Sequence, residues 1–147
     1  MDNLNNNEYQ KFAEKKIPKP TYIKNIFFAF LIGGTICTIG QFFSNYLTNL
    51  GFNEKMAGTG TSIIMVFLGA FLTGIGVYDK IGKVAGAGAA VPITGFANSM
   101  VAPAMEFKSE GFIFGVASKM FIIAGPVIVY GVGSSIIVGI LSILFKG

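Results

Sequence analysis

The chain contains no histidine, no tryptophan and no arginine, and its single cysteine is Cys37. Without histidine, a Ser-His-Asp triad, a Cys-His pair and an imidazole-ligated metal site are all excluded. One cysteine allows no disulfide within the chain, and its place inside an apolar run is typical of a small packing residue. The few carboxylates lie at the borders of apolar runs, so we expect no enzyme activity, no metal site and no cofactor.

Charge is also scarce, because Asp, Glu, Lys and Arg together make up only 12% of the 147 residues. That share is about half of what a soluble domain carries, and the mean hydropathy is +0.66. Eight of the 18 charges fall within the first 24 residues, so few remain to cover a water-soluble surface. The sequence therefore predicts an all-α integral membrane protein.

All 11 positive charges are lysine, and five precede the first apolar run: Lys11, Lys15, Lys16, Lys19 and Lys24. This placement predicts a cytoplasmic N-terminus and some attraction to anionic lipid. A nucleic-acid-binding protein would normally carry arginine on a soluble domain, so we expect no nucleic-acid partner. We predict a polar, basic cytoplasmic segment at 1–24, with an amphipathic helix or a loose tail at 1–17. A single polytopic membrane domain follows at 25–147.

Two apolar runs near the N-terminus predict membrane helices. The first covers 25–50 and the second 56–78, and each is long enough to cross a hydrocarbon core of about 30 Å. Tyr78 stands where an interfacial aromatic residue is expected. In the first run, Gly33 and Gln41 lie on a stripe of small residues that lets another helix approach, so we expect Gln41 to face protein rather than lipid.

The C-terminal apolar stretch is too long for one ordinary crossing, because 35 helical residues would extend about 52 Å. Two short spans with a tight turn are one division. The other is a partly interfacial helix at 108–119 followed by one span at 120–145. With the segment at 84–105, the chain has about four to five membrane segments.

The segment at 84–105, VAGAGAAVPITGFANSMVAPAM, has no charge but forms a poor span, since ten of its 22 residues are Gly or Ala. Hydrocarbon offers no partner to an unpaired backbone group, and Pro92 and Pro103 each remove a donor. We therefore predict a broken or re-entrant segment, made of two half-helices that meet near 91–95 and lie against protein or a wet cavity. The alternative is a kinked helix that packs tightly through its small residues.

Six residues are candidates for lining a solute path: Pro92, Thr94, Gly95, Asn98, Ser99 and Lys119. A half-helix end directs its dipole into a cavity, and Asn98 and Ser99 lie one turn past the break. The alternative role for these two is to pair with carbonyls that Pro92 leaves free. Lys119 is a lone charge in an apolar run, which favours a role with an anionic solute, unless its ammonium extends to the headgroups.

A second set of charged residues surrounds the membrane segments: Lys80, Lys83, Glu106, Lys108 and Glu110. Glu106 and Glu110 are one helical turn apart, so they would form an acidic corner able to contact a cation or a basic partner. We treat all five as candidates for contact with a partner protein, and their alternative role is to form solvated turns.

Longer motifs carry a family resemblance: GVYDKIG at 76–82, AGAG at 85–88, VPITGFANS at 91–99, Glu106 and Glu110–Phe112. Together with the first span, they resemble the stage V sporulation protein AC/AE membrane family over about residues 18–145. The basic N-terminal extension and the chain length are similar to the AC-type members. Ala89 stands where the family pattern predicts serine, so we expect no hydroxyl to bind solute there.

The resemblance implies a multi-pass protein of the spore or forespore inner membrane. It implies a subunit of a channel or transport complex that moves dipicolinic acid, with Ca²⁺, into the forespore and releases it on germination. The implied partners are SpoVA proteins, namely an AE-type membrane paralogue and a soluble AD-type protein. The alternative function is a structural subunit that scaffolds a paralogous pore subunit and docks the soluble cytoplasmic partner.

Overall fold

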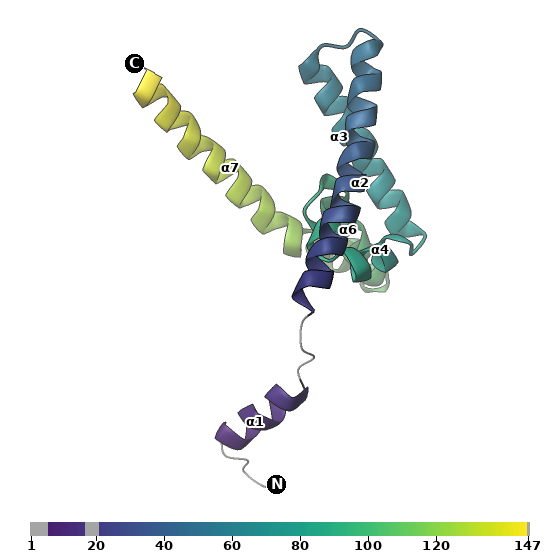
Figure 1. Cartoon of the computed structure of the whole chain (residues 1–147), viewed down its shortest axis with the longest axis vertical. Helices are drawn as coiled ribbons and strands as arrows, with labels where there is room; N and C mark the ends of the chain where they lie inside the picture. Colours follow the sequence, from purple (N-terminus) through teal and green to yellow (C-terminus); the bar gives the residue numbers. More distant parts are fainter. Residues whose placement is uncertain (1–5, 17–20, 147) are drawn as a thin grey trace.

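The computed structural model describes residues 6–16 and 21–146, which form helices joined by short turns (Figure 1). In chain order these are α1 (Asn6–Lys16), α2 (Tyr22–Asn49), α3 (Glu54–Gly74), α4 (Tyr78–Ala85), α5 (Ala87–Ala90), α6 (Ile93–Glu106), the 3-10 turn η1 (Lys108–Glu110), the π-helical turn η2 (Phe112–Ala117) and α7 (Ser118–Lys146). The predicted N-terminal helix is therefore present as α1. Residues 1–5 and 17–20 of the expected cytoplasmic segment lie outside the described residues.

Three helical stretches of the described chain are long and apolar enough to cross a membrane: Tyr22–Asn49, Glu54–Gly74 and Phe112–Phe145. They correspond to the two N-terminal spans and the C-terminal apolar stretch that the sequence predicts, which confirms the all-α membrane fold class. The expected segment at 84–105 contributes no helix of crossing length. It is divided among α4, α5 and α6.

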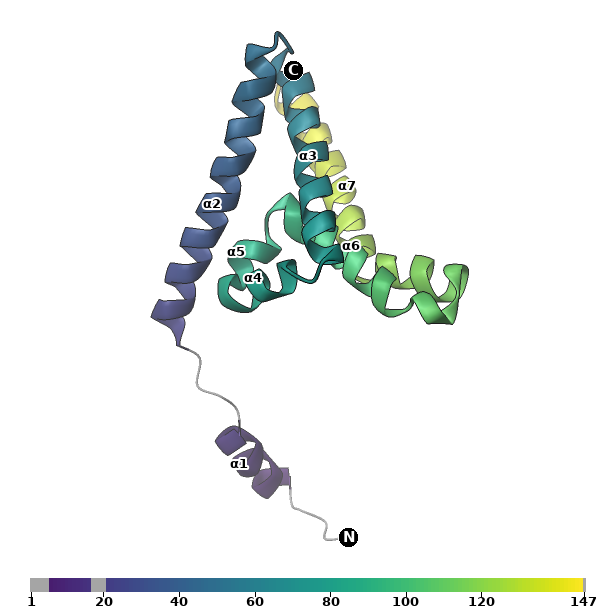
Figure 2. The same cartoon turned by 90° about the vertical axis from the view of Figure 1, so that its right-hand side faces the viewer.

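The helices α2 and α3 form an antiparallel hairpin that is closed at the 50–53 loop and open at its other end (Figure 2). Asn53 fixes the start of α3, because its Oδ1 accepts a hydrogen bond of 2.8 Å from the backbone N–H of Met56. Near the loop the helices approach closely, since a Cβ on Gly60 would lie 2.8 Å from Leu47 Cδ1. Towards the open end, α4 and α5 fill the space between the two helices and pack against α2.

Glycine and proline interrupt the chain between α3 and α6. Gly76 (φ +70°) follows the end of α3, and Gly86 (φ +52°) separates α4 from α5, both in the left-handed region that favours glycine. Pro92 has an extended backbone (ψ 161°) and stands at the N-cap of α6. The predicted break near 91–95 is therefore confirmed, with α5 and α6 as its half-helices.

A second antiparallel hairpin is formed by α6 and the start of the C-terminal helix, with its turn at η1 and Gly111 (φ +93°). Figure 2 shows this hairpin lying across the direction of α2 and α3, at the end opposite their loop. The segment at 84–105 is therefore re-entrant in arrangement and does not run back to the loop end. The C-terminal stretch is helical from Phe112 onwards with Pro126 inside α7, so it does not form two spans with a tight turn. Figure 2 shows that its first part lies in the hairpin and its later part turns towards the loop end of α2 and α3, as in the other predicted division into a helix at 108–119 and a span at 120–145.

Candidate functional site

Tyr78, the first residue of α4, lies at the centre of the broken region and is only 3% exposed. Its hydroxyl donates to the backbone carbonyl of Ala89 at 2.7 Å, and its oxygen lies 2.7 Å from Thr94 Oγ1. A tyrosine hydroxyl carries one proton, so Thr94 is the donor in the second hydrogen bond. The prediction of an interfacial Tyr78 is wrong, because this side chain joins α4, α5 and α6 from inside the fold.

The Ala89 carbonyl needs this hydrogen bond because of the break in the helix. In an uninterrupted α-helix it would accept from the N–H of Ile93, four residues later. The extended backbone of Pro92 turns the chain away, so that intrahelical bond is lost. The Tyr78 hydroxyl replaces the lost donor, and this carbonyl at the break stays paired without water.

Asn98 and Ser99 have other partners than the carbonyls at the break. Thr73 Oγ1 of α3 lies 2.9 Å from Asn98 Oδ1 and 2.7 Å from the Gly69 carbonyl, and Thr73 is buried. Ser99 donates to the carbonyl of Phe96 within its own helix at 2.8 Å. Asn98 therefore connects α6 to α3. The alternative role, in which Asn98 and Ser99 pair with the backbone carbonyls that Pro92 leaves free, is not seen in the structure.

Glycines bring the broken segment into backbone contact with both long helices. A Cβ on Gly69 of α3 would lie 2.7 Å from the Thr94 carbonyl oxygen of α6. On the other side, a Cβ on Gly88 of α5 would clash with the Ala29 carbonyl of α2, and one on Gly33 would lie 3.2 Å from the Gly88 oxygen. Small residues at Gly33 and Gly69 thus allow close helix approach, which the sequence predicts for Gly33.

A cavity of about 690 Å³ opens beside the break, between α4, α5, α6 and α7. It combines an ammonium, a carboxylate, an amide, a hydroxyl and an apolar wall, contributed by Lys83, Asp79, Asn98, Ser99, Ile123 and Val127. Gly95 also lines it. Three of the six predicted solute-path residues, Gly95, Asn98 and Ser99, therefore lie together on one cavity.

The other three solute-path candidates do not line this cavity. Pro92 sets the start of α6, and Thr94 is 4% exposed and is used by the Tyr78 hydrogen bonds. Lys119 lies on the α6–α7 hairpin, with its Nζ 4.3 Å from the centroid of the Phe107 ring. That geometry is a cation–π contact, so the structure gives the lone ammonium an aromatic partner away from the cavity.

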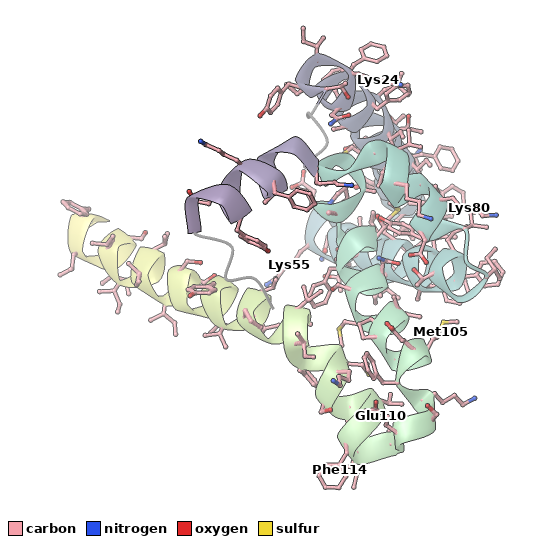
Figure 3. All side chains as sticks on the ribbon, turned by 90° about the horizontal axis from the view of Figure 1, so that it is seen from below. Lys24, Lys55, Lys80, Met105, Glu110 and Phe114 are labelled. Atoms are coloured by element: carbon pink, nitrogen blue, oxygen red, sulfur yellow. The ribbon has the colours of Figure 1, made fainter. Side chains whose placement is uncertain are left out.

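The candidates for partner contact also separate into two groups. Lys80 and Lys83 of α4 are both exposed, but only Lys83 lines the cavity. The corner residues Glu106, Lys108 and Glu110 are exposed at the hairpin turn. Lys24 lies in the first turn of α2 and Lys80 in α4, both at the open end of the α2–α3 hairpin. Figure 2 shows the second hairpin, which carries Glu110, at this same end, and Figure 3 shows these side chains.

Sequence reasoning missed the roles of Tyr78, Asp79 and Thr73. A signal for Tyr78 is present in the spacing of Tyr78, Ile81 and Ala85, which places these residues on one face of a short helix. In the structure this face packs against Ala89 and the neighbouring helices. For Asp79 no local signal separates a cavity-lining carboxylate from an ordinary loop charge.

Comparisons with known proteins agree with the motifs. A family model described as SpoVAC/SpoVAEB sporulation membrane protein matches residues 25–141, from α2 into α7. The stage V sporulation protein AC of Bacillus subtilis (strain 168) is 50% identical over 147 residues, which cover 99% of this chain and 97% of that protein. No solved structure matches. The chain belongs to the SpoVAC/SpoVAEB family of sporulation membrane proteins.

Proposed function

We propose that the chain is a subunit of a spore inner-membrane channel or transport complex that moves dipicolinic acid, with Ca²⁺, into the forespore and releases it on germination. A role in sporulation and a location in a membrane follow from the family. The solute, the direction of movement and the SpoVA partners are the proposed part. Their support is the motif resemblance together with the chemistry of the cavity at the broken helix.

The observation that carries the proposal is that Lys83 and Asn98 line the same cavity of about 690 Å³. That volume is in the usual range of small-molecule sites, about 300–1,000 Å³. Lys83 supplies a positive charge for a carboxylate, and Asn98 supplies an amide. The apolar side chains Ile123 and Val127 form a wall suited to an aromatic ring. Asp79 adds a carboxylate oxygen, the ligand type that Ca²⁺ prefers.

Release of dipicolinate from liposomes tests this proposal. Liposomes loaded with dipicolinate would contain the full chain, alone or with AE-type and AD-type proteins, and external Tb³⁺ would report release by its luminescence. We expect protein-dependent release that Lys83→Gln slows by about tenfold, the equivalent of losing ~1.4 kcal/mol of favourable interaction. Lys55→Gln removes the same charge at the loop end of the molecule and should leave the rate unchanged. Absence of release under every partner condition would contradict the proposal.

A second candidate function is a structural subunit that scaffolds a paralogous pore subunit and docks a soluble cytoplasmic partner. The exposed corner at Glu106, Lys108 and Glu110 favours it, because these residues lie outside the cavity and at the same end as Lys80. Reversing the corner with Glu106→Lys and Glu110→Lys separates the two functions. Loss of the soluble partner with unchanged dipicolinate release supports scaffolding, whereas altered release with the partner retained supports a solute path in this chain.

A further inference from the structure

A stripe of polar and small residues follows α2 on the side that is turned away from α3. Its members are all exposed: Gly34, Thr38, Gln41, Asn45 and Thr48. The side facing α3 is marked by Gly40, next to Met65, and by Leu47, next to Gly60. Successive residues of an α-helix are about 100° apart, which places the stripe on the far side of α2 from these contacts. The described part of the chain leaves this stripe uncovered.

Two members of the stripe carry amide groups on a helix that is long and apolar enough to cross a membrane. Gln41 lies about 8 Å and Asn45 about 14 Å from the middle of α2, within a hydrocarbon half-thickness of about 15 Å. Gln41 Nε2 donates to Asn45 Oδ1 at 2.8 Å, so the two amides are held side by side. Among the described residues, no side-chain hydrogen bond reaches Gln41 Oε1 or Asn45 Nδ2. Lipid tails offer no partner for them, which makes a lipid-facing position unfavourable.

The spacing of the stripe indicates what kind of partner covers it. The intervals between its members are four, three, four and three residues. This heptad spacing is typical of two helices that cross at a shallow angle in a left-handed supercoil. An amide is both donor and acceptor, so the stripe is complementary to itself. Two copies inserted in the same orientation would bring equivalent levels of the stripe together, so that Asn45 Nδ2 of each lies within about one helical turn of Gln41 Oε1 of the other. Gly34 and Thr38 are small enough for the backbones to approach.

We propose that α2 is the seam of a parallel homodimer, in which this stripe packs against the same stripe of a second copy through reciprocal Gln41–Asn45 hydrogen bonds. The axis of such a dimer runs along the membrane normal, and the interface is isologous. The opposite side of α2 stays occupied by α3, α4 and α5. The seam therefore adds to the intramolecular packing, and it does not depend on the cavity or on what the cavity binds.

Cysteine cross-linking of the full chain, reconstituted alone in liposomes, tests the seam. In a Cys37→Ser background, Thr38→Cys keeps both amides and should form a disulfide-linked dimer on oxidation. Ile39→Cys is the matched control, because Ile39 is 42% exposed at the same level of the helix but lies about 100° round it from Thr38. Adding Gln41→Leu to the Thr38→Cys chain should lower the cross-linked fraction severalfold, whereas Phe71→Leu, on α3, should not.

Three results would overturn the proposal. The first is no dimer at Thr38→Cys, or equal dimer at Thr38→Cys and Ile39→Cys, which indicates random collision. The second is rapid labelling of Thr38→Cys by a membrane-impermeant thiol reagent, which indicates that the stripe faces water. The third is loss of the Thr38→Cys dimer when the AE-type paralogue is present, which indicates that the paralogue covers the stripe.

Discussion

The Tyr78 hydroxyl and the Ala89 carbonyl form a buried hydrogen bond of 2.7 Å between residues that are 11 positions apart. The bond exists because Pro92 removes the ordinary partner of that carbonyl. We therefore expect Tyr78→Phe to leave the carbonyl unpaired and to lower the free energy of unfolding by about 1–3 kcal/mol. Unfolding in mixed detergent micelles would measure the change. Tyr46→Phe, on an exposed side chain, should have little effect, and equal stability of both variants would contradict this role.

Gly69 has no room for a side chain at the crossing of α3 and α6. Gly69→Ala would place a Cβ 2.9 Å from Thr94 Cα, so the helices must move apart, at an expected loss of about 1–3 kcal/mol. Gly58 is also in α3 but has open space around it, so Gly58→Ala should be neutral or stabilising. The same unfolding measurement serves both variants. A tolerated Gly69→Ala would mean that the two helices do not cross this closely.

Thr73 connects α3 to α6 through its contact with Asn98. Thr73→Val keeps the shape of the side chain and removes the hydroxyl, so we expect a loss of about 0.5–1.5 kcal/mol. Thr59→Val is a suitable control, because that exposed hydroxyl donates only to the Lys55 carbonyl of its own helix. If both variants lose the same stability, the link between the helices contributes nothing of its own.

The re-entrant arrangement predicts which side of the membrane carries each turn. In a Cys37→Ser background, Ser109→Cys should react with an impermeant thiol reagent from the same side as the N-terminus. Phe52→Cys, in the loop between α2 and α3, should react from the opposite side. Reaction of both cysteines from one side, or of Ser109→Cys from the side of Phe52→Cys, would show that the segment at 84–105 crosses the membrane.

The sequence predicted those parts of the fold that depend on interactions between residues close together in the chain. Apolar length identified the helices of crossing length, and Pro92 located the break because a missing N–H and a fixed φ act on the adjacent residues alone. The cavity residues Gly95, Asn98 and Ser99 followed from their distance to that break. Their common placement on one cavity supports the reasoning from backbone chemistry, although their part in a solute path stays a prediction.

The remaining features depend on contacts between distant segments. Tyr78 looked like an interfacial residue because its partner, the Ala89 carbonyl, becomes available only when Pro92 breaks the helix. Lys119 looked functional because its aromatic partner, Phe107, lies across a hairpin turn. The direction of that hairpin was also open, since apolar length sets how far a helix reaches but not whether it crosses or turns back.

The glycine contacts described above hold the broken segment against the two long helices. At Gly88 and Gly69 the broken segment touches α2 and α3 through main chain, and main-chain contacts do not yield by changing rotamers as side-chain contacts do. In α7, Ala124 is the buried residue among the described side chains of that helix. The cavity therefore has walls on α5 and α6 that main-chain contacts hold against the long helices, and a further wall at Ile123 and Val127 that depends on how the C-terminal helix packs against α6.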